Sequence, residues 1–295
     1  MMKVLSPIIL FVYNRSYETK LSVDSLKKNF LAKESNLYIF SDGPKNDSDI
    51  CNVDKVRDYV KSIDGFKKIK IFESDSNKGL ANSIIDGVSK IINQYEKVIV
   101  LEDDLVVSKN FLDFMNQALF FYEKNSKIFS ISGYTMDLPS LDKYSFDYYV
   151  GCRASSWGWG TWKYQWNQID WEIKDYNQFK YNLLSQIKFS RGGSDMPGML
   201  KKQMNGKIDS WAIRWCYNQY KKDLLTIFPS KSKLNSIGSG PDATHTKSID
   251  RFFSEIDTSD KKEFLFNNNI NPEKRILKEF RSKFSLLERL KNKLK

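Results

Sequence analysis

The sequence predicts an α/β protein with a mainly parallel central sheet that is flanked by helices. Apolar runs of strand length alternate with helical segments over the first 100 residues, and such units give parallel strands covered on both faces. One of these runs, residues 98–101, ends in three consecutive carboxylates, Glu102, Asp103 and Asp104. Residues 148–171 are rich in aromatic side chains and mark a second half of different character.

Composition and charge narrow the class of protein. The 295 residues are 41% hydrophobic and 28% charged, as in a globular protein. No apolar run approaches the roughly 20 residues that a membrane-spanning helix needs, and the N-terminus lacks a signal-peptide pattern, so a cytoplasmic protein is expected. Three widely spaced cysteines and a single histidine argue against a disulfide framework and a zinc site.

The first half alternates strands with helices. The expected strands are residues 5–13, 37–40, 68–72 and 98–101, and the expected helices are residues 17–29, 54–63 and 81–94. Asn14 and Arg15 follow the first strand, and Asp42 follows the second. Because ligands of parallel sheets bind beyond the carboxyl ends of the strands, we expect these side chains and the acidic triplet in one crevice. The sequence has no glycine-rich phosphate-binding loop.

The acidic triplet has two interpretations. Three adjacent carboxylates repel one another, and a hard divalent cation is the commonest partner that neutralises such a cluster. Alternatively, the triplet is a solvated acidic turn, with Ser108 as the N-cap of a helix over residues 109–124.

The tryptophans of the second half differ in their surroundings. After an expected strand at residues 128–132, Trp157 and Trp159 stand between glycines in an expected turn, where a sugar ring could stack on them. Trp162 and Trp166 are one helical turn apart and are expected in the core.

Two further polar residues stand out towards the C-terminus. Asp209 precedes an amphipathic helix that is expected to run to about residue 222, so it is either a helix cap or a functional carboxylate. After a short strand at residues 225–229, a loop of small residues leads to Thr244 and His245. A histidine in a polar loop is either a surface residue or part of a site.

The separated stretches, taken in order, resemble the GT-A glycosyltransferases, and among them the N-acetylglucosaminyltransferase I group and its bacterial relatives. The resemblance covers residues 5–253 and is most specific over residues 98–133. The matching stretches are residues 7–15, 41–43, 98–104 followed by Phe111, 131–133, 157–160, 209–211 and 244–245.

On the donor side, this resemblance implies a nucleotide-sugar and a bound Mn²⁺ or Mg²⁺. Asp104 takes the position of the metal ligand, and Glu102 and Asp103 lie near the ribose and the sugar. Asp42 matches the residue that contacts uracil, which favours UDP and a donor such as UDP-GlcNAc. Asn14 and Arg15 are further candidate donor contacts.

On the acceptor side, Asp209 matches the region of the catalytic base, which implies transfer to a hydroxyl of a saccharide with inversion. The family has adjacent acidic residues where this sequence has Asp209 and Ser210, so the register is open by one position. Thr244 and His245 match a loop over the diphosphate. Trp157 and Trp159 are the candidate acceptor contacts.

Two other functions compete with this interpretation. A nucleotidyltransferase of similar α/β fold also binds a nucleotide and a metal, although it normally has a basic, glycine-rich loop after the first strand. A non-enzymatic carbohydrate-binding protein would explain the tryptophans. Nucleic acid is not an expected partner despite the net charge of +11, because an acidic crevice repels a phosphate backbone.

The expected organisation is a catalytic domain over residues 1–271, with a nucleotide-sugar half at 1–133 and an acceptor half at 134–271, and a basic amphipathic helix at 272–295. The apolar stripe of this helix comprises Leu277, Phe280, Phe284, Leu287, Leu290 and Leu294. The helix either lies on an anionic membrane or packs on the domain. Membrane binding would suit a lipid-linked acceptor in bacterial surface polysaccharide synthesis.

Overall fold

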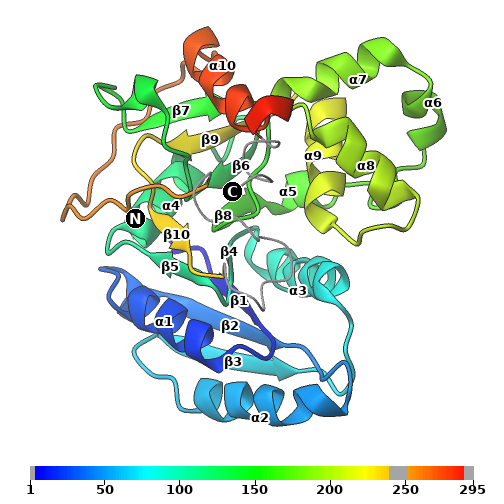
Figure 1. The fold of residues 1–295 in the computed structure, drawn as a ribbon. Helices are drawn as coiled ribbons and strands as arrows, with labels where there is room; N and C mark the ends of the chain where they lie inside the picture. Colours follow the sequence, from blue (N-terminus) through cyan, green and yellow to red (C-terminus); the bar gives the residue numbers. More distant parts are fainter. Residues whose placement is uncertain (1–3, 239–251, 289–295) are drawn as a thin grey trace.

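The computed structural model describes residues 4–238 and 252–288. Its centre is a sheet with the strand order β3-β2-β1-β4-β8-β6-β9-β7 (Figure 1). The strands are β1 (Ile8–Val12), β2 (Asn36–Ser41), β3 (Lys68–Glu73), β4 (Lys97–Glu102), β6 (Ile128–Ser132), β7 (Tyr148–Gly151), β8 (Trp159–Trp162) and β9 (Leu225–Pro229). A small ribbon of β5 (Leu105–Val107) and β10 (Leu234–Ser236) lies beside it. The structure confirms the predicted α/β class with a central sheet between helices.

The first half of the sheet is parallel, as predicted. β1 pairs in parallel with β2 and β4, and β2 pairs in parallel with β3. Side chains along β1 alternate between two apolar clusters, with Ile8 and Leu10 in one and Ile9 and Phe11 in the other. Helices α1 (Ser16–Lys27), α2 (Asp47–Lys61) and α4 (Phe111–Phe121) supply the first cluster, and α3 (Leu80–Tyr95) supplies the second.

The second half of the sheet is mixed. β8 is antiparallel to both β4 and β6, β9 is parallel to β6, and β7 is antiparallel to β9. A helical lobe stands beside this half (Figure 1). It consists of α5 (Lys163–Trp166), α6 (Tyr176–Lys180), α7 (Leu183–Phe189), α8 (Met196–Met204) and α9 (Trp211–Lys221).

The C-terminal helix α10 (Lys274–Lys283) packs on the domain. Ile276 and Phe280 are buried, and the Phe280 ring lies 5.5 Å from the Phe228 ring of β9. The Ser140 amide donates a hydrogen bond to Glu279 at 2.9 Å. The described part of the tail therefore follows the packing alternative. Because the apolar side of α10 faces the core, it cannot face a membrane, and the prediction of a membrane-bound stripe is wrong for this helix.

The other described positions of that predicted stripe differ in burial, since Phe284 is buried and Leu277 is partly buried. Leu287 is exposed, whereas Leu290 and Leu294 lie outside the described residues. None of the helices in the described part of the chain combines the length and apolar character needed to cross a bilayer.

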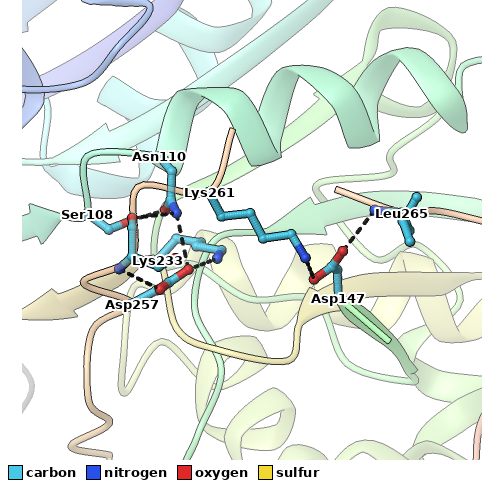
Figure 2. A network of polar contacts seen from close by, with 8 residues as sticks. Ser108, Asn110, Asp147, Lys233, Asp257, Lys261 and Leu265 are labelled. Carbon is cyan, nitrogen blue, oxygen red and sulfur yellow. Dashed lines mark hydrogen bonds and ion pairs between the residues drawn. The ribbon is translucent and has the colours of Figure 1, made fainter. Parts of the chain in front are cut away.

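A buried ion pair fastens the segment before α10 to the sheet (Figure 2). Lys233 Nζ lies 2.5 Å from Asp257 Oδ2, and both side chains are almost fully buried. The side-chain amide of Asn110 donates to the same carboxylate at 3.1 Å, and Ser108 Oγ donates to Asn110 Oδ1 at 2.8 Å. Burial opposes ionisation of Asp257, but the hydrogen bond and charge of Lys233 outweigh it and lower the pKa of Asp257. The pair fixes Lys233 directly before β10.

Candidate functional site

The acidic triplet and Arg15 meet at the carboxyl end of the central strands. Glu102 ends β4, and Asp103 and Asp104 form the turn before β5. The Arg15 guanidinium pairs with the buried Asp103 carboxylate and reaches Asp104 Oδ2 at 3.3 Å. The Tyr13 amide donates to Asp103 Oδ2 at 3.3 Å. The structure thus brings together the ends of β1 and β4 in the way that parallel strands predict.

This cluster carries more negative charge than Arg15 can neutralise. Burial, with the charges of Asp104 and Asp103, raises the pKa of Glu102 to about 8. Burial also raises the pKa of Asp103 to about 6, against the opposing effect of Arg15. Both shifts have the same physical cause, which is the cost of holding adjacent carboxylates away from water. An additional cation at this position would relieve that cost.

Asp104 is the triplet member that is suited to a metal ion. Its side chain is partly exposed, whereas Asp103 is buried against Arg15. The described residues contain no preformed group of three metal-ligating side chains. Mg²⁺ is commonly held by one or two carboxylates together with substrate phosphates, so this donor set fits a cation that binds along with a diphosphate.

Asp42 holds the loop between β3 and α3. Its carboxylate accepts hydrogen bonds from the amides of Gly43 at 2.9 Å, Lys78 at 2.9 Å and Gly79 at 3.1 Å. Gly79 has a φ of 76°, a backbone conformation that glycine adopts without strain. A carboxylate offers about four acceptor positions, so most of those of Asp42 are occupied. The main role that the structure shows for Asp42 is to hold this loop.

Tyr13 is a residue of the crevice that the sequence analysis missed. Its hydroxyl donates to Asp49 Oδ2 at 2.9 Å and accepts from the Lys45 amide at 3.0 Å. The side-chain amide of Asn14 donates a hydrogen bond to Asp49 Oδ1 at 3.0 Å. Asp49 on α2 therefore holds both residues that follow β1, and Lys45 joins Tyr13 to the loop after β2. The position of Tyr13 at the end of the first strand was the signal that could have identified it.

Asp209 lies next to the loop that Asp42 holds. A β-carbon at Gly79 would be 4.0 Å from Asp209 Oδ2. Ser210, not Asp209, is the N-cap of α9, because its Oγ accepts a hydrogen bond from the Ile213 amide at 3.3 Å. The helix-cap alternative for Asp209 is therefore wrong by one residue. The carboxylate is 61% exposed and lies 3.3 Å from Arg214, so it remains accessible to a ligand.

The tryptophans divide differently from the prediction. Trp159 is fully buried, with its ring 4.3 Å from that of Trp215 and 5.6 Å from that of Trp166. Because no face of the ring is open, the prediction that a sugar stacks on Trp159 is wrong. The expectation that Trp162 and Trp166 belong to the core is confirmed.

Trp157 differs from Trp159 because it is only partly buried. Its ring packs edgewise against Tyr134 at 4.7 Å and against Phe252 at 6.1 Å. It thus remains a candidate for contact with a ligand. Thr244 and His245 lie outside the described residues.

No protein-family model matches the sequence, and no curated protein matches it. The mannosyltransferase PcManGT from Pyrobaculum calidifontis, solved with GDP-Man and Mn²⁺, aligns with 54% of this chain and 45% of its own, at a TM-score of 0.38 and 9% identity. S. aureus TarS 1–349 aligns with 78% of this chain and 60% of its own, at a TM-score of 0.41 and 12% identity.

The galactosyltransferase LgtC, solved with donor and acceptor sugar analogs, aligns with 74% of this chain and 72% of its own, at a TM-score of 0.39 and 12% identity. This chain therefore spans less than half of PcManGT and three fifths of TarS 1–349.

Proposed function

We propose that the chain is a divalent-metal-dependent glycosyltransferase. It would move a sugar from a nucleotide-sugar donor to a hydroxyl of a saccharide acceptor, as in the synthesis of a bacterial surface polysaccharide. The observation that carries this proposal is the acidic triplet at the end of β4, in which Asp103 is buried against Arg15 while Asp104 stays partly exposed. A solvated acidic turn would not need a buried carboxylate with its own guanidinium partner.

The donor diphosphate belongs next to Asp104 and Arg15. Cleavage of the bond between sugar and diphosphate leaves negative charge on the leaving oxygen. A bound Mn²⁺ or Mg²⁺ would neutralise that charge as a Lewis acid. Arg15 already lies 3.3 Å from Asp104, so its guanidinium can reach phosphate oxygens placed beside that carboxylate. Glu102 and Asp103 would then border the ribose and the sugar.

The nucleoside belongs between the ends of β1 and β2. Tyr13 and Asn14 are fixed there through Asp49, and Asp42 fixes the neighbouring loop. The match of Asp42 to the uracil contact of the family that the sequence resembles makes UDP the nucleotide of choice and UDP-GlcNAc the first donor to test.

The acceptor hydroxyl belongs next to Asp209. This carboxylate is exposed and free of a capping role. As a general base it would remove the proton of the hydroxyl during attack on the anomeric carbon. Attack from the face opposite the diphosphate inverts the configuration. Trp157 is a candidate platform for the acceptor ring.

The geometry gives less support to a non-enzymatic carbohydrate-binding function. A carbohydrate-binding protein that stacks a sugar on both tryptophans does not fit, because Trp159 is buried. Such a protein also has no need for the charge at Asp104.

A thermal-shift and turnover screen tests the proposal. UDP-, GDP-, CDP- and dTDP-sugars are each added with Mn²⁺, with Mg²⁺ or with EDTA. We expect UDP-sugars to raise the Tm only when metal is present, because a ligand that binds the native state stabilises it. Slow hydrolysis of UDP-GlcNAc, in which water replaces the saccharide acceptor and UDP is released, should also require metal. A nucleoside triphosphate that stabilises the chain while every nucleotide-sugar fails would instead indicate a nucleotidyltransferase.

A further inference from the structure

The helical lobe carries an exposed apolar surface at α6 and α7, which we call the α6–α7 tip. Its members are Tyr181, Leu183, Leu184 and Ile187, whose side chains are 58% to 80% exposed. Leu183, Leu184 and Ile187 occupy one face of α7, at positions i, i+1 and i+4. Isolated exposed leucines need no explanation, but adjacent ones on one helix face indicate an interaction surface.

The opposite side of the tip is firmly packed. Phe179 and Phe189 are buried, and their rings lie 5.1 Å and 5.6 Å from that of Tyr217 on α9. The Asn182 side chain caps α7 by accepting a hydrogen bond from the Ser185 amide at 2.9 Å. The exposed leucines are thus presented by a well-anchored helix.

The surroundings of the tip are basic. Residues 174–207 contain seven Lys and Arg residues and two Asp residues, a net charge of +5. Both acids are engaged in ion pairs, Asp175 with Lys221 and Asp195 with Arg153 at 2.9 Å. The basic residues are Lys174, which pairs with Glu172 just before this range, and Lys180, Lys188, Arg191, Lys201, Lys202 and Lys207. Apolar side chains flanked by the exposed cations Lys180 and Lys188 match the surface of an anionic bilayer.

We propose that the α6–α7 tip docks into the headgroup region of an anionic phospholipid membrane. Leu183, Leu184 and Ile187 enter the boundary between headgroups and acyl chains, as the apolar faces of interfacial helices do. The tyrosine ring of Tyr181 suits the same depth, since it is apolar with a polar end. Lys180 and Lys188 flank the leucines and can extend their amines to lipid phosphates.

This surface differs from the membrane-binding tail that the sequence predicts, because the apolar side of α10 is buried. It also has a geometric link to the candidate site. α9 carries Tyr217 under the tip and begins two residues after Asp209, and its 11 residues span roughly 16 Å. Docking would therefore hold Asp209 near the membrane, where a lipid-linked acceptor is located. Only this last step rests on the proposed function.

Sedimentation with vesicles tests the docking. The full chain is incubated with vesicles of phosphatidylcholine alone, or with phosphatidylglycerol added, at low and high salt. We expect binding only to the anionic vesicles, and weaker binding as salt rises. The variant Leu183→Ser/Leu184→Ser/Ile187→Ser should bind at least roughly tenfold more weakly, because three apolar side chains no longer leave water. Leu265→Ser, at a leucine that is 77% exposed outside the tip, is the matched control and should bind normally.

A second variant tests the charge. Lys180→Glu/Lys188→Glu should weaken binding to anionic vesicles while circular dichroism and Tm stay unchanged, since both residues lie at the exposed ends of the tip. The proposal is overturned if the full chain stays in the supernatant at low salt, or if the triple variant binds as well as the control. It is equally overturned if the triple variant differs only by turning a dimer into a monomer, since the occupant would then be a second copy of the chain. Failure of the UDP-sugar screen would leave these results unaffected.

Discussion

Gly238 lies directly against Asp104. A β-carbon at Gly238 would be 1.9 Å from Asp104 Oδ2, and the Ile237 amide donates to the Asp104 carbonyl at 2.8 Å. The end of β10 is thus held on the carboxylate that the proposed function assigns to the metal. Only glycine leaves room for that carboxylate in this position.

This contact predicts that Gly238→Ala removes metal-dependent UDP binding. The added methyl group must displace either the Asp104 carboxylate or the backbone after β10, and either shift moves the ligand of the cation. Isothermal titration calorimetry with UDP and Mn²⁺ measures the effect. Gly198→Ala in α8 is the matched control, since a β-carbon there meets nothing within 4 Å. Equal UDP affinity in both variants would separate Gly238 from the site.

Asp104→Asn tests the carboxylate itself. An amide has nearly the same size but is a poorer ligand for a hard cation, so UDP binding should lose its dependence on Mn²⁺ while the Tm changes little. Asp142→Asn, at an exposed carboxylate outside the crevice, serves as the control. Retention of Mn²⁺-dependent affinity by Asp104→Asn would contradict the assignment of the metal ligand.

The sequence predicted the parts of the site that follow from local patterns. The end of β1 lies beside the end of β4 because both strands are apolar, parallel and adjacent, and this brings Arg15 to Asp103. The helical segment 81–94 and the strands 128–132 and 225–229 agree closely with the observed elements, since their apolar spacing is regular. α2 begins earlier than expected, at Asp47 rather than at residue 54, because its first turn is polar and exposed.

Other features depend on contacts between distant segments. Trp159 is buried because Trp211 and Trp215 of α9 close over it, and nothing in the residues around Trp159 indicates that helix. The carboxylate of Asp42 is occupied by amides 36 and 37 residues further along the chain. The apolar side of α10 includes Ile276, which the predicted stripe omitted in favour of Leu277, because the facing β9 and not the spacing decides which side is covered.

The buried pair of Lys233 and Asp257 predicts a pH-dependent stability. Lys233→Met leaves Asp257 buried without its cation, which should lower the free energy of unfolding by about 3–5 kcal/mol at neutral pH. Because the folded-state pKa of Asp257 is lowered, its contribution is present above the unfolded pKa of about 4 and is lost as pH falls through the folded value.

Urea unfolding of the wild type and Asp257→Asn at a series of pH values measures that contribution. The difference in unfolding free energy between the two proteins should be constant from pH 7 to about pH 5 and should shrink below about pH 4. Lys261→Met, which removes the exposed partner of Asp147, is the control and should cost at most about 1 kcal/mol. A difference that stayed constant down to pH 2 would show that the ionised form of Asp257 is not what stabilises the fold.

Asp209 and Ser210 allow base catalysis to be separated from helix capping. Asp209→Asn should lower turnover by roughly a hundredfold, the scale expected when a general base is lost, while UDP affinity and Tm stay near those of the wild type. Ser210→Ala should do the reverse, because its Oγ caps α9: stability falls by about 1 kcal/mol and turnover is kept. Turnover is measured as UDP release with a saturating donor, and stability by urea unfolding.

The pair of variants is informative because the two residues are neighbours with different contacts. Asp209 is exposed and faces the loop at Gly79, whereas Ser210 is engaged with the backbone of its own helix. If Asp209→Asn loses stability and keeps its turnover, the carboxylate acts through Arg214 as a structural ion pair. If Asp209→Asn loses turnover while its UDP affinity and stability stay at the wild-type level, the carboxylate removes the proton of the acceptor hydroxyl.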